Sequence, residues 1–333
     1  MIYKKIIRPL LFHLDAERSH TMVLKLLKCW GAIGKAQPLA SQPVKVMGLI
    51  FPNRIGLAAG LDKNGEAIDG WATLGFGCLE IGTVTPKPQR GNAQPRLFRL
   101  PQQQALLNRM GFNNHGVEQM IANIKRAKYQ GILGINIGKN AHTPIEQATN
   151  DYLFCLTHLY AYASYITINI SSPNTKNLRD LQHGAQLENL LAALKNRQQQ
   201  LHQQHKRYVP LVVKIAPDLT GEEIATIAQL LLTYSLDAVI ATNTTKQRMG
   251  IDVLAKEQGG LSGAPLTQLS TTIIRQLSQH LQHKIPIIAA GGIMSPAEAK
   301  AKLAAGASLI QLYTGLIYHG PALLRAINQE LSL

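Results

Sequence analysis

The chain has 333 residues, of which 46% are hydrophobic, and a formal net charge of +15 from 34 lysines and arginines against 19 acidic residues. This length allows one to three domains, and the charge favours an anionic partner such as a membrane surface, a nucleic acid or an acidic small molecule. The cysteines Cys29, Cys78 and Cys155 are widely spaced and form no CxxC pair or Cys/His ligand spacing, so neither a disulfide framework nor a zinc site is supported, and a reducing compartment is favoured.

The first ~45 residues differ in pattern from the rest and are predicted to form two short helices. Arg8 and Pro9 interrupt the first apolar stretch and no small-residue cleavage site follows, so we expect no signal peptide. One face of the second helix is apolar, with Lys25 and Lys28 near it: Met22, Val23, Leu26, Leu27 and Trp30. This helix either caps the following domain or lies on a membrane surface, and the positive charge favours the membrane.

From about residue 53 onward, short apolar runs alternate with longer amphipathic ones. The runs predicted to be strands are residues 55–58, 78–81, 132–135, 165–168, 211–213, 238–241, 285–289 and 309–312. Strands that alternate with helices form a parallel sheet, and this number of units fits a closed barrel better than an open sheet. We therefore predict an α/β fold, a (β/α)8 TIM barrel with a small N-terminal helical extension.

Polar side chains follow every predicted strand at the point where it ends. The richest cluster is Asn169-Ile170-Ser171-Ser172-Pro173-Asn174-Thr175, directly after the fourth strand. Since Ser, Asn and Pro are ordinary turn formers, this segment alone predicts a turn as readily as a ligand site. In a barrel, however, the carboxyl ends of all strands meet on one face, which carries the active site. The joint placement of the polar ends favours a site for a planar, amide-like ligand.

Glycines after the last two predicted strands suit a phosphate group. Gly291 and Gly292 allow close backbone approach, the helix that opens at Ser295 favours an anion, and Gly315 follows the eighth strand. The sequence has no Walker motif and no GxGxxG at the start of a βαβ unit, so a dinucleotide fold is not predicted. A mononucleotide such as FMN fits this pattern.

Two lysines, Lys63 and Lys214, stand at strand ends among apolar or small residues. Lysine usually extends to solvent, but here one cation suits a flavin ring and the other a substrate carboxylate. Four asparagines accompany them: Asn108, Asn169, Asn174 and Asn243. Their amides can donate to and accept from the imide edges of a pyrimidine. No Asp/Glu pair of the glycosidase type and no strand-end histidine is present, so the hydroxyl of Ser172 is the candidate proton acceptor.

In this order, the motifs closely resemble those of dihydroorotate dehydrogenases of the quinone-dependent, membrane-associated class. The matching segments are residues 14–20, 58–63, 80–86, 95–100, 108–114, 134–138, 169–175, 213–218, 241–245, 259–263 and 291–293. These segments are spread over nearly the whole chain in the same order, which makes the resemblance specific. In the cytosolic classes of the family the base is a cysteine, whereas Ser172 occupies the matching position here. The resemblance therefore implies the quinone-dependent class.

The resemblance implies a role for each matched position. FMN would be held by Ala59, Gly60, Thr83, Asn136, Asn169, Lys214, Thr242, Gly263, Gly292, Tyr313 and Thr314. Dihydroorotate would be held by Lys63, Asn108, Arg109, Met110, Gly111, Phe112, Asn169, Asn174, Asn243 and Thr244. Ser172 would be the catalytic base, and His20, Arg99 and Tyr313 would lie near the quinone. No metal is implied.

The implied function is oxidation of (S)-dihydroorotate to orotate, with FMN as hydride acceptor and a membrane quinone as final electron acceptor, in de novo pyrimidine (UMP) biosynthesis. Residues 1–45 would form a membrane- and quinone-docking segment and residues 46–333 the FMN-binding barrel. The N-terminal helices would contact an anionic membrane peripherally, at the cytoplasmic face of a bacterial inner membrane. No nucleic-acid partner is expected.

Two other functions are compatible with parts of the sequence. A tRNA dihydrouridine synthase is also a flavin barrel that handles dihydropyrimidines, and the net charge suits RNA. That family, however, has a cysteine acid where this chain has Ser172, and a C-terminal RNA-binding domain. A non-catalytic anion- or nucleic-acid-binding protein would leave the polar strand ends without a purpose, and it predicts a colourless preparation.

Overall fold

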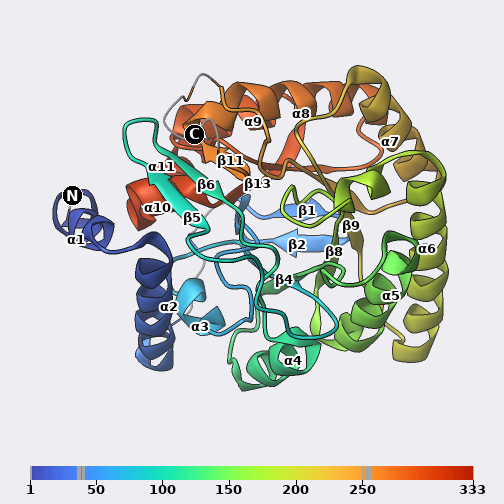
Figure 1. Cartoon of the computed structure of the whole chain (residues 1–333), viewed down its shortest axis with the longest axis horizontal. Coiled ribbons are helices and arrows are strands. Elements are labelled where there is room, and N and C mark those ends of the chain that lie inside the picture. The colour runs from blue at the N-terminus through green and yellow to red at the C-terminus, as the bar shows by residue number, and fades with distance from the viewer. Residues whose placement is uncertain (1, 36–38, 40–41, 250, 252–256, 333) are drawn as a thin grey trace.

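Eight parallel strands close into a barrel in the order β10-β12-β13-β3-β4-β7-β8-β9 (Figure 1). The computed structural model describes residues 2–35, 39, 42–249, 251 and 257–332. The barrel strands are β3 (Ile55–Leu57), β4 (Cys78–Val84), β7 (Ile132–Ile137), β8 (Tyr165–Asn169), β9 (Leu211–Ile215), β10 (Ala238–Ala241), β12 (Ile287–Ala290) and β13 (Ala307–Leu312). Each predicted apolar run overlaps one of these strands, and the predicted α/β barrel is confirmed.

Helices surround the barrel and bury the outer face of its strands. They are α3 (Ile68–Ala72), α4 (Gly116–Arg126), α5 (Ala148–Leu159), α6 (Gly184–His205), α7 (Gly221–Thr233), α8 (Thr267–Leu281), α9 (Pro296–Ala304), α10 (Thr314–His319) and α11 (Pro321–Leu331). Both faces of the strands are covered, so every residue of β8 and β9 is buried and these strands are largely apolar. In α7, Thr220 and Glu223 form a capping box that marks the start of the helix.

A β-hairpin closes the amino end of the barrel. It consists of β1 (Val44–Val46) and β2 (Leu49–Phe51), which pair antiparallel. Val46 and Phe51 pack with residues from the starts of the strands, including Tyr165 at the first position of β8. This apolar plug removes water from one end of the barrel and leaves the carboxyl end for a ligand.

A three-stranded antiparallel sheet, absent from the sequence prediction, lies beside the carboxyl end. Its strands are β5 (Leu97–Leu100), β6 (Ala105–Asn108) and β11 (Gly260–Gly263), in the order β11-β6-β5. β6 pairs with β11 from Ala105 opposite Gly263 to Asn108 opposite Gly260. This pairing brings two distant parts of the chain together at the edge of the site described below.

The N-terminal helices lie at one side of the barrel (Figure 1). A π-helical segment, Tyr3–Ile7, continues into α1 (Arg8–His13), and α2 (Ala16–Ile33) follows, in agreement with two predicted helices. Tyr3 Oη donates to Ile317 O at 2.6 Å, and Arg96 forms a 2.6 Å ion pair with Glu17 at the start of α2. The helices are therefore anchored to the barrel domain by polar contacts as well as by packing.

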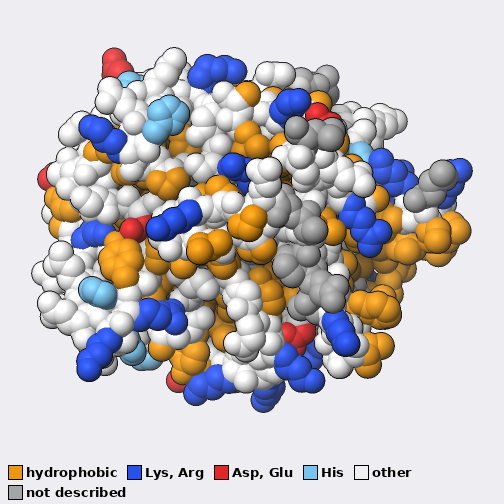
Figure 2. Space-filling view, turned by 180° about the vertical axis from the view of Figure 1, so that it is seen from behind, with side chains coloured by type: hydrophobic (Ala, Val, Ile, Leu, Met, Phe, Trp, Pro, Cys, Tyr) orange, Lys and Arg blue, Asp and Glu red, His pale blue; other side chains and the backbone are white. Residues whose placement is uncertain are grey.

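The apolar residues of α2 divide between two faces rather than sharing one. Val23 and Leu27 line a cavity toward the barrel, whereas Leu26 and Trp30 are 62% and 56% exposed. Figure 2 shows hydrophobic and basic side chains together on the projecting N-terminal region. No helix in the described part of the chain is both long and apolar enough to cross a membrane. The boundary at residue 45 stays a prediction, because residues 1, 36–38, 40 and 41 lie outside the described residues.

Candidate functional site

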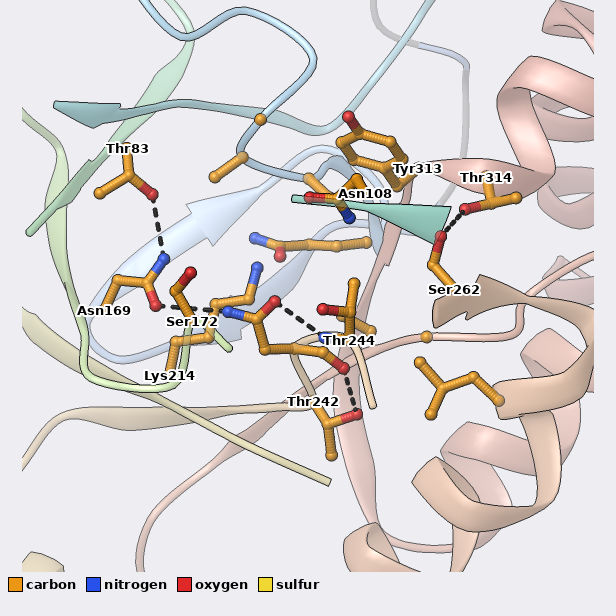
Figure 3. Close-up of a pocket in the computed structure, with 18 of the residues that line it drawn as sticks. Thr83, Asn108, Asn169, Ser172, Lys214, Thr242, Thr244, Ser262, Tyr313 and Thr314 are labelled. Atoms are coloured by element: carbon orange, nitrogen blue, oxygen red, sulfur yellow. Dashed lines mark hydrogen bonds between the residues drawn. The ribbon is translucent and has the colours of Figure 1, made fainter. Parts of the chain in front are cut away.

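A cavity opens where the barrel strands end, with an empty volume of about 1000 Å³ including its open mouth (Figure 3). Most of the predicted site residues line it: Ala59, Gly60, Lys63, Thr83, Asn108, Met110, Phe112, Asn169, Ser172, Asn174, Lys214, Thr242, Asn243, Thr244, Gly263, Gly292, Tyr313 and Thr314. Residues far apart in the sequence thus meet in one pocket, as the barrel hypothesis requires.

Three predicted binding residues do not line the cavity: Asn136, Arg109 and Gly111. Arg109 forms an ion pair with Glu257, donates to Pro95 O at 2.8 Å and stacks on Phe98 with its guanidinium carbon 5.0 Å from the ring centroid. Its side chain therefore supports the loop around β5. Gly111 has a φ of 70°, which allows the turn after Met110.

The amide of Asn169 is the centre of a hydrogen-bond chain across the cavity wall. Its Nδ2 donates to Thr83 Oγ1 at 3.0 Å and to Asn136 Oδ1 at 3.1 Å. Its Oδ1 accepts from Asn243 Nδ2 at 3.3 Å (Figure 3). This chain fixes the amide orientations along the wall, and it gives Asn136 a place directly behind the cavity-lining residues.

A buried carboxylate, Glu80, lies beneath this chain and was given no role by the sequence reasoning. Its Oε1 accepts from Asn136 Nδ2 at 2.8 Å. Its Oε2 accepts from Tyr165 Oη at 3.0 Å and from Gln311 Nε2 at 2.7 Å. The sequence did contain a signal for this role, because Glu80 is a single acidic residue inside an otherwise apolar predicted strand. Such a residue is almost never fully buried unless it is paired, so buried polar partners could have been expected.

Two cationic side chains enter the cavity. Burial lowers the pKa of Lys214, and the charge of Glu80 opposes this shift. Burial also lowers the pKa of Lys63, to about 8, although the nearby Glu17 raises it. Lys63 Nζ donates to Gly60 O at 3.1 Å, which holds it at the end of β3. Partly desolvated cations of this kind attract an anionic ligand more strongly than exposed ones.

Ser172 lines the cavity and is 6% exposed as a residue. Its Oγ accepts a hydrogen bond from the backbone N–H of Asn174 at 3.2 Å. Asn174 Nδ2 in turn donates to Asn108 Oδ1 at 3.1 Å, which links this loop to β6. The Oγ1 of Thr175 is buried without a hydrogen-bond partner within the described part of the chain. A free buried hydroxyl close to Ser172 in sequence is suited to pass on a proton.

Gly292 and Gly263 form a glycine cradle on the opposite wall, where the backbone lies close to the cavity. Gly292 and Gly263 have φ angles of 70° and 97°. A Cβ atom would lie 2.3 Å from Thr267 Cα at Gly292 and 2.3 Å from Gln104 O at Gly263, so only glycine fits. Nearby, the Oε1 of Gln311 is a buried acceptor without a partner. These groups fit a flavin mononucleotide. The close backbone suits its phosphate, the two lysines suit its electron-poor ring, and the free acceptor suits its ring N–H.

A second, mainly apolar cavity lies between the N-terminal helices and the barrel. Its lining includes Ala16, Val23, Leu24 and Leu27 from α2, together with the predicted His20, Arg99 and Tyr313. Burial, followed by the charge of Lys63, lowers the pKa of His20 to about 3, so this imidazole is neutral. Tyr313 lines both cavities.

Comparison with known proteins agrees with this architecture. Residues 41–333 match the family model described as dihydroorotate dehydrogenase. The chain belongs to the dihydroorotate dehydrogenase family. A protein from Aromatoleum aromaticum named dihydroorotate dehydrogenase (quinone) is 60% identical over 97% of this chain and 93% of its own length. A protein of the same name from Nitrosomonas eutropha is 59% identical over 98% of this chain and 96% of its own length. The predicted family and the enzyme class, an oxidoreductase, are confirmed.

A solved dihydroorotate dehydrogenase structure has the same fold. The enzyme from Eimeria tenella in complex with ferulenol superposes with a TM-score of 0.88 at 37% identity, over 95% of this chain and 90% of that chain. Its ligand-free form gives a TM-score of 0.87. The likeness extends over nearly all of this chain, and so it supports the topology described above.

Proposed function

We propose that this enzyme oxidises (S)-dihydroorotate to orotate, with FMN as hydride acceptor and a membrane quinone as final electron acceptor, in de novo pyrimidine biosynthesis. The observation that carries the proposal is Ser172, which lines a cavity that contains amides and two lysines. Relatives at 58–60% identity bear the name dihydroorotate dehydrogenase (quinone), which supports the same assignment.

FMN would occupy the side of the cavity that the glycine cradle forms. The proposed contacts are Ala59, Gly60, Thr83, Asn169, Lys214, Thr242, Gly263, Gly292, Tyr313 and Thr314, all of which line the cavity. Asn136, also predicted to hold FMN, would act from behind them by orienting Asn169. The Lys214 ammonium would stabilise negative charge on the ring, and the glycine backbone would contact the phosphate. When bound, FMN supplies a two-electron acceptor for a hydride and a donor for a quinone. The Oγ of Ser262 and the Oγ1 of Thr314, 2.8 Å apart, add two hydroxyls at this end.

Dihydroorotate would lie between the flavin site and the Ser172 loop. Asn108, Asn174 and Asn243 would contact its imide edges, because each amide offers both a donor and an acceptor. Lys63 would pair with its carboxylate. The remaining proposed contacts are Met110, Phe112, Asn169, Thr244 and the backbone near Arg109 and Gly111. The lysine and the amides would then stabilise the charge that develops on the pyrimidine.

Ser172 would remove the proton from C5 while a hydride leaves C6, so that a carbon–carbon double bond forms in the ring. A serine hydroxyl is a weak base at its ordinary pKa and needs a route for its own proton. The proposed relay is Thr175 or an ordered water, and the buried hydroxyl of Thr175 has no partner among the described residues. The relay would carry the proton away from Ser172.

The second cavity would admit the quinone. Its apolar lining suits an isoprenoid quinone, and Tyr313 lines both this cavity and the proposed flavin site. His20 and Arg99 would contact the quinone oxygens. Arg99 already donates to Phe12 O at 3.1 Å and to Leu14 O at 2.8 Å, which holds its guanidinium at this cavity.

The N-terminal helices would dock on the cytoplasmic face of a bacterial inner membrane. Ile2, Ile6 and Leu10 are 67%, 56% and 64% exposed, and Ile33 at the end of α2 is 79% exposed. Lysines adjoin these apolar side chains in the sequence: Lys4, Lys5, Lys25 and Lys28. Apolar side chains with neighbouring basic ones favour peripheral binding to anionic lipid.

The test is a purified preparation mixed with dihydroorotate under anaerobic conditions. We expect a flavin absorption spectrum that bleaches on addition of dihydroorotate and returns on addition of a quinone, but not of fumarate or NAD. A colourless protein that gains no flavin spectrum with added FMN would contradict the proposal and favour a non-catalytic binding protein. Return of the spectrum with fumarate or NAD in place of quinone would contradict the proposed acceptor.

A pH dependence of ligand binding follows from Lys63. Its pKa of about 8 means that it loses its proton as the pH rises through that value, whereas a bound carboxylate favours the protonated form. We expect orotate affinity to be constant below pH ~8 and to fall above it. Replacement of Lys63 by methionine should cost about 2 kcal/mol or more at neutral pH, roughly 30-fold in affinity, and remove this pH dependence.

Titration of orotate into the holoenzyme between about pH 6 and pH 10, followed by the flavin absorbance, measures both effects. Lys128, an exposed lysine beyond α4, provides a matched control when it is replaced by methionine. An unchanged decline above pH ~8 in the Lys63→Met variant would assign the titration to another group.

A further inference from the structure

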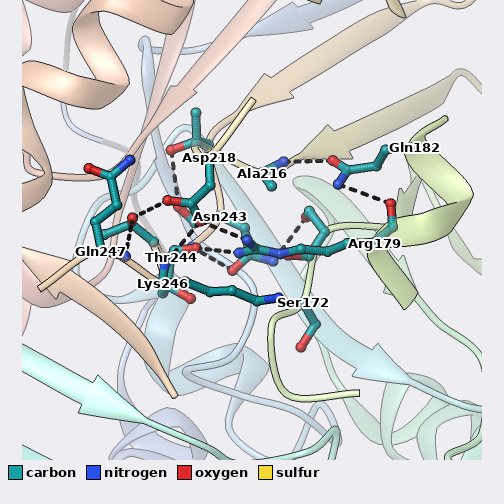
Figure 4. Close-up of polar contacts among 12 residues, drawn as sticks. Ser172, Arg179, Gln182, Ala216, Asp218, Asn243, Thr244, Lys246 and Gln247 are labelled. Atoms are coloured by element: carbon teal, nitrogen blue, oxygen red, sulfur yellow. Dashed lines mark hydrogen bonds and ion pairs between the residues drawn. The ribbon is translucent and has the colours of Figure 1, made fainter. Parts of the chain in front are cut away.

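Arg179 connects the loops that follow three neighbouring barrel strands (Figure 4). It lies on a short 3₁₀ helix, Leu178–Gln182, within the connection that also contains Ser172. Its Nε donates to Ser171 O at 3.0 Å, and its Nη2 donates to Thr244 O at 2.9 Å. Its Nη1 forms a 2.6 Å ion pair with Asp218, after β9. One planar guanidinium thus holds both Ser171, which precedes Ser172, and Thr244, which is a proposed substrate contact.

Asp218 extends the same connection on the other side. Its Oδ2 accepts from Lys246 N at 2.9 Å, and its Oδ1 accepts from the hydroxyl of Thr245. The loop after β10, which presents Asn243 and Thr244, is therefore attached to the Arg179–Asp218 pair at several points. The pair is well enclosed, with side-chain exposures of 13% and 16%.

The short helix has a second attachment that does not involve charge. Gln182 Oε1 accepts from Ala216 N at 2.8 Å, just beyond β9. Neither Arg179 nor Asp218 lines the cavity, so neither side chain contacts a ligand there. Their contacts instead determine how two loops that do line the cavity lie relative to each other.

We propose that Arg179 is a positioning residue, which acts through Asp218 to hold the Ser172 hydroxyl at the correct place relative to substrate bound by Asn243 and Thr244. The inference rests on the proposed role of Ser172 as base. Proton and hydride leave adjacent carbons, so the base must lie on one particular side of the ring. A displacement of about 1 Å at such a contact reduces a rate by up to about 10²-fold.

Loss of the Arg179 guanidinium contacts should slow the reaction without weakening ligand binding. Asn243 has its own anchors, because its Nδ2 donates to Ser171 Oγ at 3.0 Å as well as to Asn169 Oδ1. In the Arg179→Gln holoenzyme we expect flavin reduction by dihydroorotate to slow by about 10²-fold, with orotate affinity within about threefold of wild type. Stopped-flow absorbance gives the rate constant, and orotate titration gives the affinity.

The Arg179→Lys variant separates charge from geometry. Lysine keeps a cation beside Asp218 but cannot donate in three fixed directions, so this variant should fold and still be slow. The Asp218→Asn variant should be slow as well, and the double Arg179→Gln/Asp218→Asn variant should be no slower than the slower single one, since both act through one connection.

An ion pair at the other end of the barrel is the matched control. Lys195 and Asp237 lie 4.0 Å apart with side-chain exposures of 16% and 15%, close to those of Arg179 and Asp218. Lys195→Gln should change thermal stability alone, with flavin reduction at the wild-type rate. Thermal melting of every variant shows whether it is folded.

Wild-type flavin reduction in Arg179→Lys, or a rate that falls only in proportion to orotate affinity, would overturn the inference. Ser172→Ala in the same assay distinguishes this failure from that of the proposed function. If Ser172→Ala is slow while Arg179→Gln is normal, only the positioning role is wrong. If Ser172→Ala is itself normal, the proposed base is wrong and the positioning role falls with it.

Discussion

Replacement of Ser172 by alanine is expected to slow flavin reduction by dihydroorotate by about 10²–10⁴-fold at neutral pH, the usual contribution of a general base. In the proposed mechanism the Ser172 hydroxyl accepts the C5 proton, and alanine removes it without filling the space. Orotate should still bind, because its proposed contacts come from the asparagines and Lys63. Anaerobic stopped-flow measurement of the flavin absorbance tests this directly.

Two further variants sharpen the Ser172 test. Ser172→Cys replaces the hydroxyl by a thiol with a pKa of about 8.5, so it should retain more activity than Ser172→Ala and show a rate that rises with pH. Ser164 precedes β8 at the opposite end of the same strand, where its Oγ accepts from Leu133 N at 3.0 Å. Ser164→Ala should reduce flavin normally. A wild-type rate in Ser172→Ala would eliminate Ser172 as the base.

Replacement of Ala16 by phenylalanine is expected to slow reoxidation by quinone at least about tenfold while flavin reduction by dihydroorotate is unchanged. Ala16 begins α2 and lines the second cavity, where a phenyl ring would occupy space proposed for the quinone. A loss of about 1.4 kcal/mol in quinone binding is a factor of ten in affinity, and a ring in the proposed quinone space is expected to cost at least that much. Double-mixing stopped flow separates the two half-reactions.

The matched control for Ala16 lies on the far side of the molecule. Ala225 is a half-buried alanine on α7 that lines neither cavity. Ala225→Phe should leave both half-reactions unchanged. Equal slowing of both half-reactions in Ala16→Phe would indicate a general distortion of the barrel and would exclude a specific role of the second cavity in quinone access.

The barrel was predictable because its signal is local. Each strand is a short apolar run buried on both faces, such as Ala238–Ala241, and each is followed by polar residues. The three-stranded sheet has no such signal. Its strand β11, Gly260–Gly263, contains two glycines and is stabilised by pairing with β6 from a distant part of the chain. Such pairing depends on tertiary context rather than on β-propensity.

Most of the candidate site was also predictable, since polar strand ends in a barrel converge on one face. The predicted residues that do not line the cavity have side chains whose direction the sequence does not determine. The Arg109 side chain turns toward Glu257 and Phe98, and Asn136 lies one layer behind the cavity. Glu80 was overlooked because its partners Tyr165 and Gln311 come from other strands and become neighbours only when the barrel closes.

The presence of two cavities that share Tyr313 has a kinetic consequence. An aqueous metabolite and a lipid-dissolved oxidant would bind in different cavities, so they would not compete for the same space. With the flavin reduced from one cavity and reoxidised from the other, we expect a ping-pong cycle: the first product can depart before the second reactant arrives, and each reactant saturates its own half of the cycle. An inhibitor lodged among the N-terminal helices would be competitive with the oxidant and uncompetitive with the metabolite.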